Sequence, residues 1–226
     1  GIMYNKAVYA EYGLEVPTTW DEFAANNDAL LAAGVTPMAA SFADTWTSQL
    51  LVLADYHNVA AEIPTFAEDF TANKIDYATT PAALKGLERL QEAYEKGWWN
   101  EDFGSTNLDG ALAMLANGEV AHYPMLTFAV GQIAATFPDA ADDIGFFAQP
   151  GDDAATNGLT LWMPQAMYIA QTSDHVDVAK DFLAFVASVP GTEVMSAAVP
   201  PSGPYLVNGA SLPADTVLWN DAGLGP

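Results

Sequence analysis

Few side chains of this sequence combine the type and the spacing that catalysis or metal binding requires. His57, His122 and His175 lie far apart, and none has an acidic or thiol neighbour at the spacing of a metal site. The nucleophile elbow, zinc-protease helix, Walker loop and dinucleotide glycines are missing as patterns. Asp102-Phe103-Gly104 spells a kinase tripeptide, but the glycine-rich loop and the catalytic-loop signature do not accompany it. We therefore expect no catalytic residue, no metal ion and no cofactor.

Carboxylates are so abundant in this sequence that a pair of them is weak evidence for a catalytic or cation-binding site. The 226 residues include 29 Asp and Glu against six Lys and Arg, giving a formal charge of −23 and a pI near 4.1. Two carboxylates at helical spacing therefore say little about glycoside hydrolysis, which stays open as an alternative. We interpret the acidic residues at positions 139–153 as a solubilising surface in preference to a cation site. A field of this sign repels nucleic acid and anionic membranes, so neither is an expected partner.

A short polar loop with aromatic side chains follows an apolar run. Residues 35–40 read as a strand, and a polar loop carrying Phe42, Asp44 and Trp46 follows. A helix is expected from about residue 47 to residue 57. The end of a strand, a loop and aromatic side chains therefore meet at one place.

Alternating helices and strands must position this loop. Residues 1–5 read as a strand and residues 6–12 as a short helix that Gly13 ends. Thr19 and Glu22 form a capping box at the start of the next helix. The expected inward stripe of that helix is Trp20, Phe23, Ala24, Asn27, Leu30 and Leu31.

The same alternation continues downstream and predicts an α/β fold. An amphipathic helix is expected over residues 80–97, with an apolar stripe of Leu84, Leu87, Leu90 and Tyr94. The other expected elements are helices at 107–117, 127–136 and 176–188 and strands at 119–123, 144–148, 159–163 and 167–170. After residue 200 the periodicity is lost, and glycine and proline predict an irregular surface segment.

Composition indicates how large a core the chain can form and which covalent links it cannot make. With 51% hydrophobic and 12% aromatic residues, the chain can fill the core of one large or two small lobes. It has no cysteine, which excludes a disulfide framework and thiolate chemistry. No apolar stretch reaches the roughly 18 residues that a membrane span needs, so we expect no direct membrane insertion in this segment.

The order of several motifs resembles that of one protein family. Met3-Tyr4-Asn5-Lys6 precedes a short helix, then Gly13-Leu14-Glu15-Val16-Pro17 and Thr18-Thr19-Trp20-Asp21-Glu22-Phe23. Later blocks are Ala33-Gly34-Val35-Thr36-Pro37, Tyr94-Glu95-Lys96-Gly97, Ala113-Met114-Leu115-Ala116-Asn117-Gly118-Glu119-Val120-Ala121, Ile144-Gly145-Phe146-Phe147 and Ala179-Lys180-Asp181-Phe182-Leu183. In this order they resemble the bacterial extracellular solute-binding proteins of ABC sugar importers, the family that includes maltose-binding protein.

The resemblance implies a periplasmic-binding-protein-like (type II) bilobal fold, with two α/β lobes joined by a hinge and the ligand held between them. In that pattern residues 1–155 resemble a carboxy-terminal-type lobe, residues 156–199 a part of the other lobe, and residues 200–226 a return crossing or irregular tail. Full members are nearly twice this length. We therefore expect the chain to cover mainly one lobe and to be truncated at both ends.

The same resemblance implies where a ligand binds. It places Asp44 where the family has an acidic ligand residue and Trp46 where it has a stacking aromatic, with Phe42 in the same loop. Sugar sites combine aromatic platforms with polar side chains, because a sugar ring presents C–H faces flanked by hydroxyls. The complete set of expected ligand-binding residues is Phe42, Asp44, Trp46, Thr127, Phe128 and Trp162.

The family implies a receptor that captures a carbohydrate outside the cytoplasm and delivers it to ABC-transporter permease subunits, without catalysis. An oligosaccharide is the expected cargo, and the receptor is expected to be monomeric, either anchored as a surface lipoprotein or located in the periplasm. Three alternatives remain open. They are a peptide, polyamine or other small solute as cargo, a glycoside-active enzyme, and a structural surface protein without a ligand.

Overall fold

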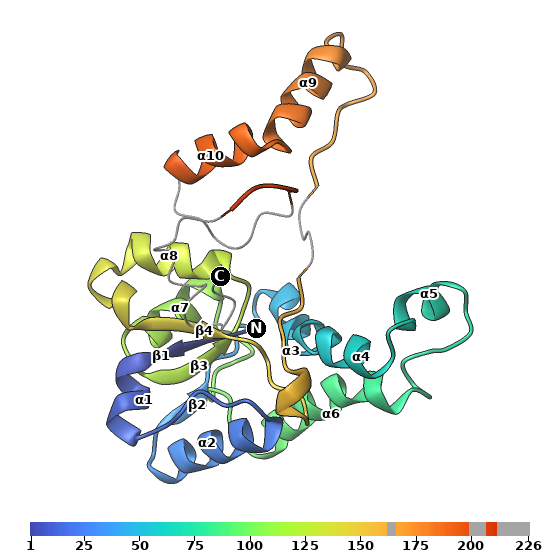
Figure 1. Cartoon of the computed structure of the whole chain (residues 1–226). Helices are drawn as coiled ribbons and strands as arrows, with labels where there is room; N and C mark the ends of the chain where they lie inside the picture. The colour runs from blue at the N-terminus through green and yellow to red at the C-terminus, as the bar shows by residue number, and fades with distance from the viewer. Residues whose placement is uncertain (162–165, 199–206, 212–226) are drawn as a thin grey trace. The chain divides into compact units, whose positions relative to one another are not determined.

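The computed structural model describes residues 1–161, 166–198 and 207–211 of the chain (Figure 1). Contacts within the chain define two compact units, one built from residues 1–160 and the other beginning at Leu161. The assignment of residues 1–155, 156–199 and 200–226 to parts of a larger bilobal fold stays a prediction.

A four-stranded sheet in the order β2-β3-β1-β4 lies at the centre of the first unit. Its strands are β1 (Ile2–Asn5), β2 (Thr36–Met38), β3 (Val120–Pro124) and β4 (Ile144–Phe147). β1 pairs antiparallel with both β3 and β4, whereas β2 runs parallel to β3. The four strands predicted in this region are confirmed, with small differences at their ends.

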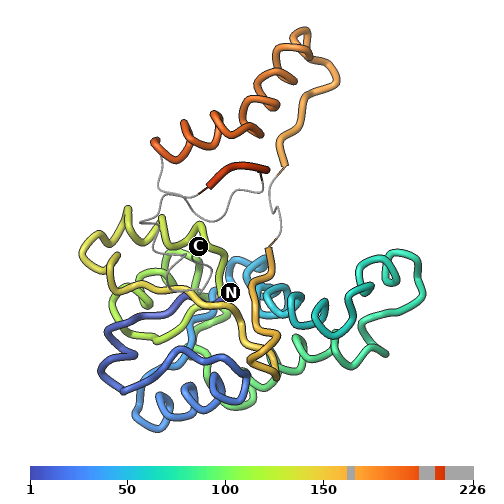
Figure 2. Tube along the Cα trace, in the orientation of Figure 1, coloured from blue at the N-terminus to red at the C-terminus, as the bar shows by residue number. Residues whose placement is uncertain are grey.

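Helices cover both faces of the sheet (Figures 1 and 2). The helices of this unit are α1 (Lys6–Tyr12), α2 (Trp20–Ala32), α3 (Leu50–Ala54), α4 (Tyr56–Glu62), α5 (Phe66–Thr71), α6 (Pro81–Glu95), α7 (Leu108–Ala116) and α8 (Phe128–Thr136), with the 3-10 helices η1 (Thr45–Gln49), η2 (Pro138–Asp143) and η3 (Ala154–Thr156). Successive strand residues point to opposite faces. Met3 accordingly packs in the core under α7 and α8, whereas Ile2 and Tyr4 pack in the core under α1 and α2.

The predicted start and end signals of α1 and α2 are confirmed. Gly13 has φ +64° after α1, a left-handed conformation that a residue without a side chain adopts at low cost. The backbone N–H of Glu22 donates to the Thr19 hydroxyl at 3.3 Å, and the Glu22 carboxylate accepts from the Thr19 N–H at 3.1 Å. The expected inward stripe is buried through Leu30, but Leu31 is 42% exposed, because it lies one helical step beyond the packed face.

The single helix predicted for residues 47–57 is wrong in detail. The chain instead forms η1, α3 and α4, and Asp55 separates the two α-helices. Asp55 is 1% exposed, and its carboxylate accepts hydrogen bonds from Arg89 and from Asn58. The buried ion pair holds Asp55 at this break, which sequence periodicity does not reveal.

Helix α6 forms as predicted, but the residues it buries are small ones and Arg89, which lie beside the predicted apolar stripe. Ala82, Ala83, Gly86, Arg89 and Ala93 are buried. Of the apolar stripe, Leu84 and Leu90 are half-buried, whereas Leu87 is 45% exposed and Tyr94 is 64% exposed. A Cβ on Gly86 would lie 3.3 Å from Asp55 and from the Val52 backbone, so small residues are needed where α6 meets α3.

The second unit contains α9 (Val176–Val186) and α10 (Val189–Ala198). The helix predicted at 176–188 is therefore confirmed, and its expected inward residues Val176, Ala179, Leu183 and Val186 are half-buried. The strand pair predicted at 159–163 and 167–170 is wrong within the described residues, where 159–161 and 167–170 carry no strand. A strand needs a neighbouring strand to pair with, and the sequence pattern does not show whether one is present.

Candidate functional site

The candidate site lies at the carboxyl ends of the two parallel strands. Residues 39–41 continue from β2, and Tyr123 and Pro124 end β3. Together with η1, α3, Leu90 and Trp99 they line a hollow of about 10 Å³, enough for roughly one water molecule. Ligands of α/β proteins commonly bind outside the carboxyl ends of parallel strands. This hollow is too small to enclose a sugar ring, and we call its buried polar lining the floor.

Three buried hydroxyl groups form the floor. The Ser41 hydroxyl lies 2.5 Å from the Tyr123 hydroxyl and 3.1 Å from the Thr47 hydroxyl, and Thr47 also donates to the Ser41 carbonyl at 2.9 Å. Burial raises the pKa of Tyr123, and the charge of Asp44 contributes in the same direction. Tyr123 therefore stays a neutral phenol that can donate a hydrogen bond. None of these three residues was predicted as a site residue, although each lies in or directly after a strand or in the aromatic loop.

Asp44 connects this floor to helix α7. One oxygen of its carboxylate, Oδ2, accepts the backbone N–H of Leu108 at 2.7 Å, at the first turn of that helix. A carboxylate is stabilised there because the helix amino-terminus carries partial positive charge. The predicted acidic ligand residue thus has an architectural role. Its carboxylate fixes the aromatic loop against α7, and its other oxygen remains available for a further hydrogen bond.

Trp46 and Phe128, which are far apart in the sequence, lie next to each other in the structure. Their ring centroids are 6.4 Å apart, and their planes are inclined by 35°. Trp46 is 38% exposed and Phe128 is half-buried at the start of α8. Thr127 is half-buried directly before Phe128. The structure therefore brings together two predicted aromatic residues and leaves part of the tryptophan ring open to solvent.

Phe42 has a different environment. It is half-buried, and its ring packs edge-on against Trp99 at 5.8 Å and against Phe103 at 5.6 Å. Its backbone N–H donates to the Phe103 carbonyl at 2.9 Å, which fixes the start of the loop. Phe42 lines the hollow on the side of Trp99 and Leu90. Trp162, the remaining predicted site residue, lies outside the described residues.

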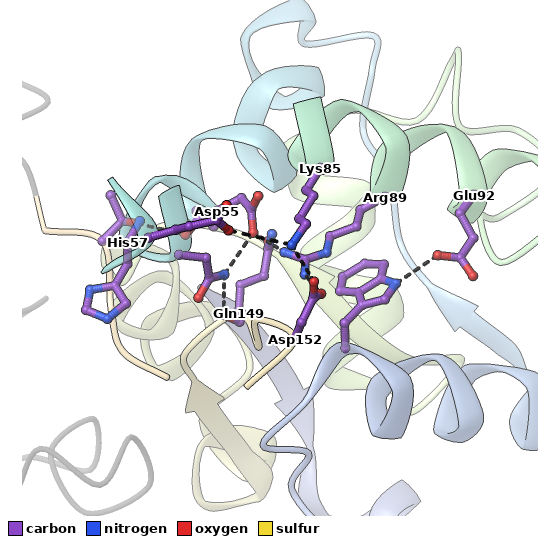
Figure 3. Close-up of polar contacts among 12 residues, drawn as sticks. Asp55, His57, Lys85, Arg89, Glu92, Gln149 and Asp152 are labelled. Atoms are coloured by element: carbon purple, nitrogen blue, oxygen red, sulfur yellow. Dashed lines mark hydrogen bonds and ion pairs between the residues drawn. The ribbon is translucent and has the colours of Figure 1, made fainter. Parts of the chain in front are cut away.

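A second polar region lies between α4, α6 and the chain after β4 (Figure 3). Arg89 pairs with Asp55 and, at 2.6 Å, with Asp152, and Lys85 pairs with Asp152 at 2.5 Å. Burial raises the pKa of Asp55, and the charge of Arg89 opposes that shift. A hollow of about 240 Å³ adjoins these groups. Because the charges neutralise one another within the protein, we interpret this region as a structural network.

His122 is buried in the core and does not lie in either hollow. Its Nε2 is 2.7 Å from the Tyr9 hydroxyl, and its Nδ1 is 3.0 Å from the Pro37 carbonyl. Burial lowers its pKa to about 3, so the ring is neutral at ordinary pH. Among the residues that the structure describes, no three His, Cys, Asp or Glu side chains are grouped to hold a metal ion.

The comparisons with known proteins agree with the observed architecture. The model of the bacterial extracellular solute-binding protein family matches residues 1–193. The chain belongs to this family. The fold is the periplasmic-binding-protein-like one: the solute-binding protein RafE, solved with raffinose, matches 98% of this chain and 57% of its own with a TM-score of 0.70 at 21% identity.

Two further relatives carry the names of sugar receptors. The multiple sugar-binding protein of Streptococcus mutans serotype c is 28% identical over an alignment of 197 positions, which covers 83% of this chain and 45% of that protein. A chitin oligosaccharide binding protein matches 70% of this chain and 41% of its own, with a TM-score of 0.59 and 25% identity. The chain therefore spans about half the length of the relatives that it matches. In the described part of the chain, no helix is long and apolar enough to cross a membrane.

Proposed function

We propose that this chain forms the sugar-contacting surface of one lobe of an extracytoplasmic receptor that delivers a carbohydrate to an ABC-transporter permease. The observation that carries the proposal is the aromatic pair of Trp46 and Phe128, partly exposed beside a floor of hydroxyl groups. An oligosaccharide is the proposed cargo. The receptor is proposed to bind without turnover, as a monomer, either anchored as a lipoprotein or free in the periplasm.

The chemistry of this surface suits a sugar. The open face of Trp46 offers a platform for the C–H face of a pyranose ring, and stacking of this kind favours flat, uncharged ligands. Phe128 backs the platform, and Thr127 lies beside it as a hydroxyl donor. Trp162 stays a predicted ligand-binding residue and lies outside the described residues.

The position of Asp44 argues against a cationic cargo. Its carboxylate already accepts a hydrogen bond from the amino-terminus of α7, which partly neutralises its charge. A polyamine would need carboxylates that lack partners in the protein. The remaining Asp44 oxygen instead suits a single sugar hydroxyl, so a neutral polyol fits the site better than a polyamine or a cationic peptide.

The proposed mechanism is closure of two lobes over the ligand. A ligand that contacts both lobes binds the closed state more tightly and shifts the population toward it. The permease then distinguishes the closed form from the open one. For this reason the surface described here is expected to bind sugar weakly without the opposite lobe.

A thermal-shift screen tests the proposal, using the protein extended to the length of its relatives. Mono-, di- and oligosaccharides, polyamines and short peptides are each added in excess, because a ligand of the native state raises Tm in proportion to RT ln(1 + [L]/Kd). We expect one sugar class to raise Tm in a saturable way and Trp46→Ala to abolish the rise. Tyr12→Ala is the matched control, since Tyr12 is also 38% exposed but lies on α1.

Each other result of the screen has a definite meaning. If only a polyamine or a peptide raises Tm, the protein is still a solute receptor, but its cargo is not a sugar. Turnover of a chromogenic glycoside would favour the glycoside-active enzyme. If no solute raises Tm, the receptor proposal loses its support and a structural surface protein becomes the better interpretation.

A further inference from the structure

The loop that carries Trp46 is anchored near both of its ends. At its start, the Phe42 N–H donates to the Phe103 carbonyl at 2.9 Å. At its end, directly after Trp46, the Thr47 hydroxyl donates to the Ser41 carbonyl at 2.9 Å and closes the loop on itself. The backbone next to the Trp46 ring is therefore held by a side-chain hydrogen bond of the neighbouring residue.

The three hydroxyl groups of the floor form a chain of hydrogen bonds with one direction. A hydroxyl has a single proton, and that of Thr47 is used on the Ser41 carbonyl. Thr47 therefore accepts from the Ser41 hydroxyl at 3.1 Å, and Ser41 accepts from the Tyr123 phenol at 2.5 Å. All three residues are no more than 5% exposed. Their protons are committed inside the protein, so this hydroxyl chain links parts of the fold and does not supply donors to a ligand.

The hydroxyl chain joins the same two segments as the aromatic pair. Tyr123 lies in β3, and Phe128 begins α8 shortly after that strand. Ser41 and Thr47 lie on either side of Trp46 in the aromatic loop. Helix α8 packs in the same core cluster as Tyr123. With Phe128 held by that core, the hydroxyl chain determines where the Trp46 ring lies beside it.

We propose that Tyr123, Ser41 and Thr47 are positioning residues, which hold the Trp46 ring beside Phe128 and so set the affinity for a stacked ligand. The ring centroids of the pair are 6.4 Å apart and Trp46 is 38% exposed, so the contact between the rings leaves the tryptophan room to turn. A platform held in its bound geometry binds more tightly than a mobile one, because less conformational entropy is lost on binding. The effect on affinity rests on the proposed function, whereas the effect on the position of the ring does not.

Two substitutions of Thr47 separate its hydroxyl group from its packing. Thr47→Val keeps the branched shape and removes the hydroxyl, whereas Thr47→Ser keeps the hydroxyl and removes a buried methyl group. Thr47→Ser is therefore the matched control. Tyr123→Phe breaks the hydroxyl chain at its other end and serves as the second test variant. All variants are made in the protein extended to the length of its relatives.

Fluorine NMR of protein labelled with 5-fluorotryptophan reports on the Trp46 ring, and Trp46→Phe identifies its resonance. One sharp Trp46 resonance is expected for the wild type and for Thr47→Ser. Thr47→Val and Tyr123→Phe should broaden or split it, because the ring then samples more than one position. An unchanged resonance in Thr47→Val would overturn the proposal, and Tyr123→Phe decides in its place if Thr47→Val does not fold. Equal changes in Thr47→Ser and Thr47→Val would also overturn it, since packing would then be the cause.

Sugar affinity is measured on the same variants by titration with raffinose and with chitotriose, a chitin oligosaccharide, after two of the relatives described above. For a sugar that the wild type binds, Thr47→Val should weaken binding by about tenfold and Thr47→Ser by less than about threefold. Wild-type affinity in Thr47→Val would overturn the effect on affinity. If neither sugar binds but the Trp46 resonance broadens as expected, the positioning role stands and the failure lies in the proposed function.

Discussion

The Arg89 network and the Trp46 loop lie in the same unit but use polar and aromatic groups in opposite ways. Around Arg89, charges are buried or paired and hold α4 and α6 to the chain that leaves the sheet. Around Trp46, the hydroxyl groups satisfy one another and an aromatic ring stays partly exposed. Paired charges therefore fix the architecture around Arg89, whereas the Trp46 loop is held by hydroxyl groups and keeps an aromatic ring partly exposed.

The comparison also shows which hollow is the better candidate for function. The larger hollow, of about 240 Å³, is bordered by charges that already have partners inside the protein. The smaller hollow is bordered by the carboxyl ends of two parallel strands and by the loop that carries Trp46. Volume alone would favour the larger hollow, whereas the hydrogen bonds and ion pairs favour the smaller one as the candidate site.

Replacement of Arg89 is expected to have the largest effect on stability. Arg89→Met leaves the carboxylate of Asp55, which is 1% exposed, without its cation, and should lower the free energy of unfolding by about 3–5 kcal/mol. Urea denaturation followed by tryptophan fluorescence measures the change. Lys96→Met is the matched control, since Lys96 pairs with Asp28 and Glu92 at an exposed site and should cost less than about 1 kcal/mol. Equal losses for the two variants would contradict a structural role of the network.

Acid should destabilise the protein through His122. Burial lowers its pKa to about 3 in the folded state, against 6.5 for an ordinary histidine, so between these values the unfolded chain binds more protons. The stabilising contribution is therefore complete above pH 6.5 and is lost as pH falls toward 3. Between pH 6.5 and 5, where most carboxylates are still ionised, the loss should be about 2 kcal/mol.

The His122→Gln variant checks that assignment. It removes the titrating ring but keeps groups that can bond to Tyr9 and to the Pro37 carbonyl. Its free energy of unfolding should fall by about 2 kcal/mol less than that of the wild type between pH 6.5 and 5. An unchanged slope in the variant would assign the acid sensitivity to other groups.

Substitutions of Asp44 separate its contribution to stability from its proposed contribution to sugar binding. Asp44→Ala removes the acceptor of the Leu108 N–H and should cost about 1 kcal/mol, in the range of lost helix caps. Asp44→Asn keeps an oxygen acceptor and should cost less. In the longer protein Asp44→Asn is expected to reduce sugar affinity more than it reduces stability. If Asp44→Ala were as stable as the wild type, the Asp44 carboxylate would not stabilise the loop against α7.

Much of the local structure was predictable from the sequence because its signals are local. The capping box of Thr19 and Glu22 and the left-handed Gly13 act within a few residues, and both were predicted correctly. The orientation of α6 was not predictable, because it depends on an ion pair between Arg89 and Asp55, which are 34 residues apart. Periodicity identified an apolar stripe on that helix but could not say which face packs.

The candidate site was predictable only through the family resemblance. That resemblance identified Trp46 and Phe128, which do lie together, although whether they bind a ligand stays a prediction. The hydroxyl groups of Ser41, Thr47 and Tyr123 were missed, because serine, threonine and tyrosine carry no distinctive spacing. Their proximity arises from the parallel pairing of β2 and β3, which is a long-range property of the sheet.

Two tryptophans give the sharpest comparison of an architectural and a candidate ligand-binding aromatic residue. Trp20 is 6% exposed, lies under Arg89 and donates to Glu92 at 2.8 Å, so Trp20→Ala should cost about 3–5 kcal/mol. Trp46 is 38% exposed and its ring lies beside that of Phe128, so Trp46→Ala should cost about 1 kcal/mol or less. Urea unfolding of both variants measures the difference. If Trp46→Ala were as costly as Trp20→Ala, the exposed ring would be a structural element and the sugar platform would have to be sought elsewhere.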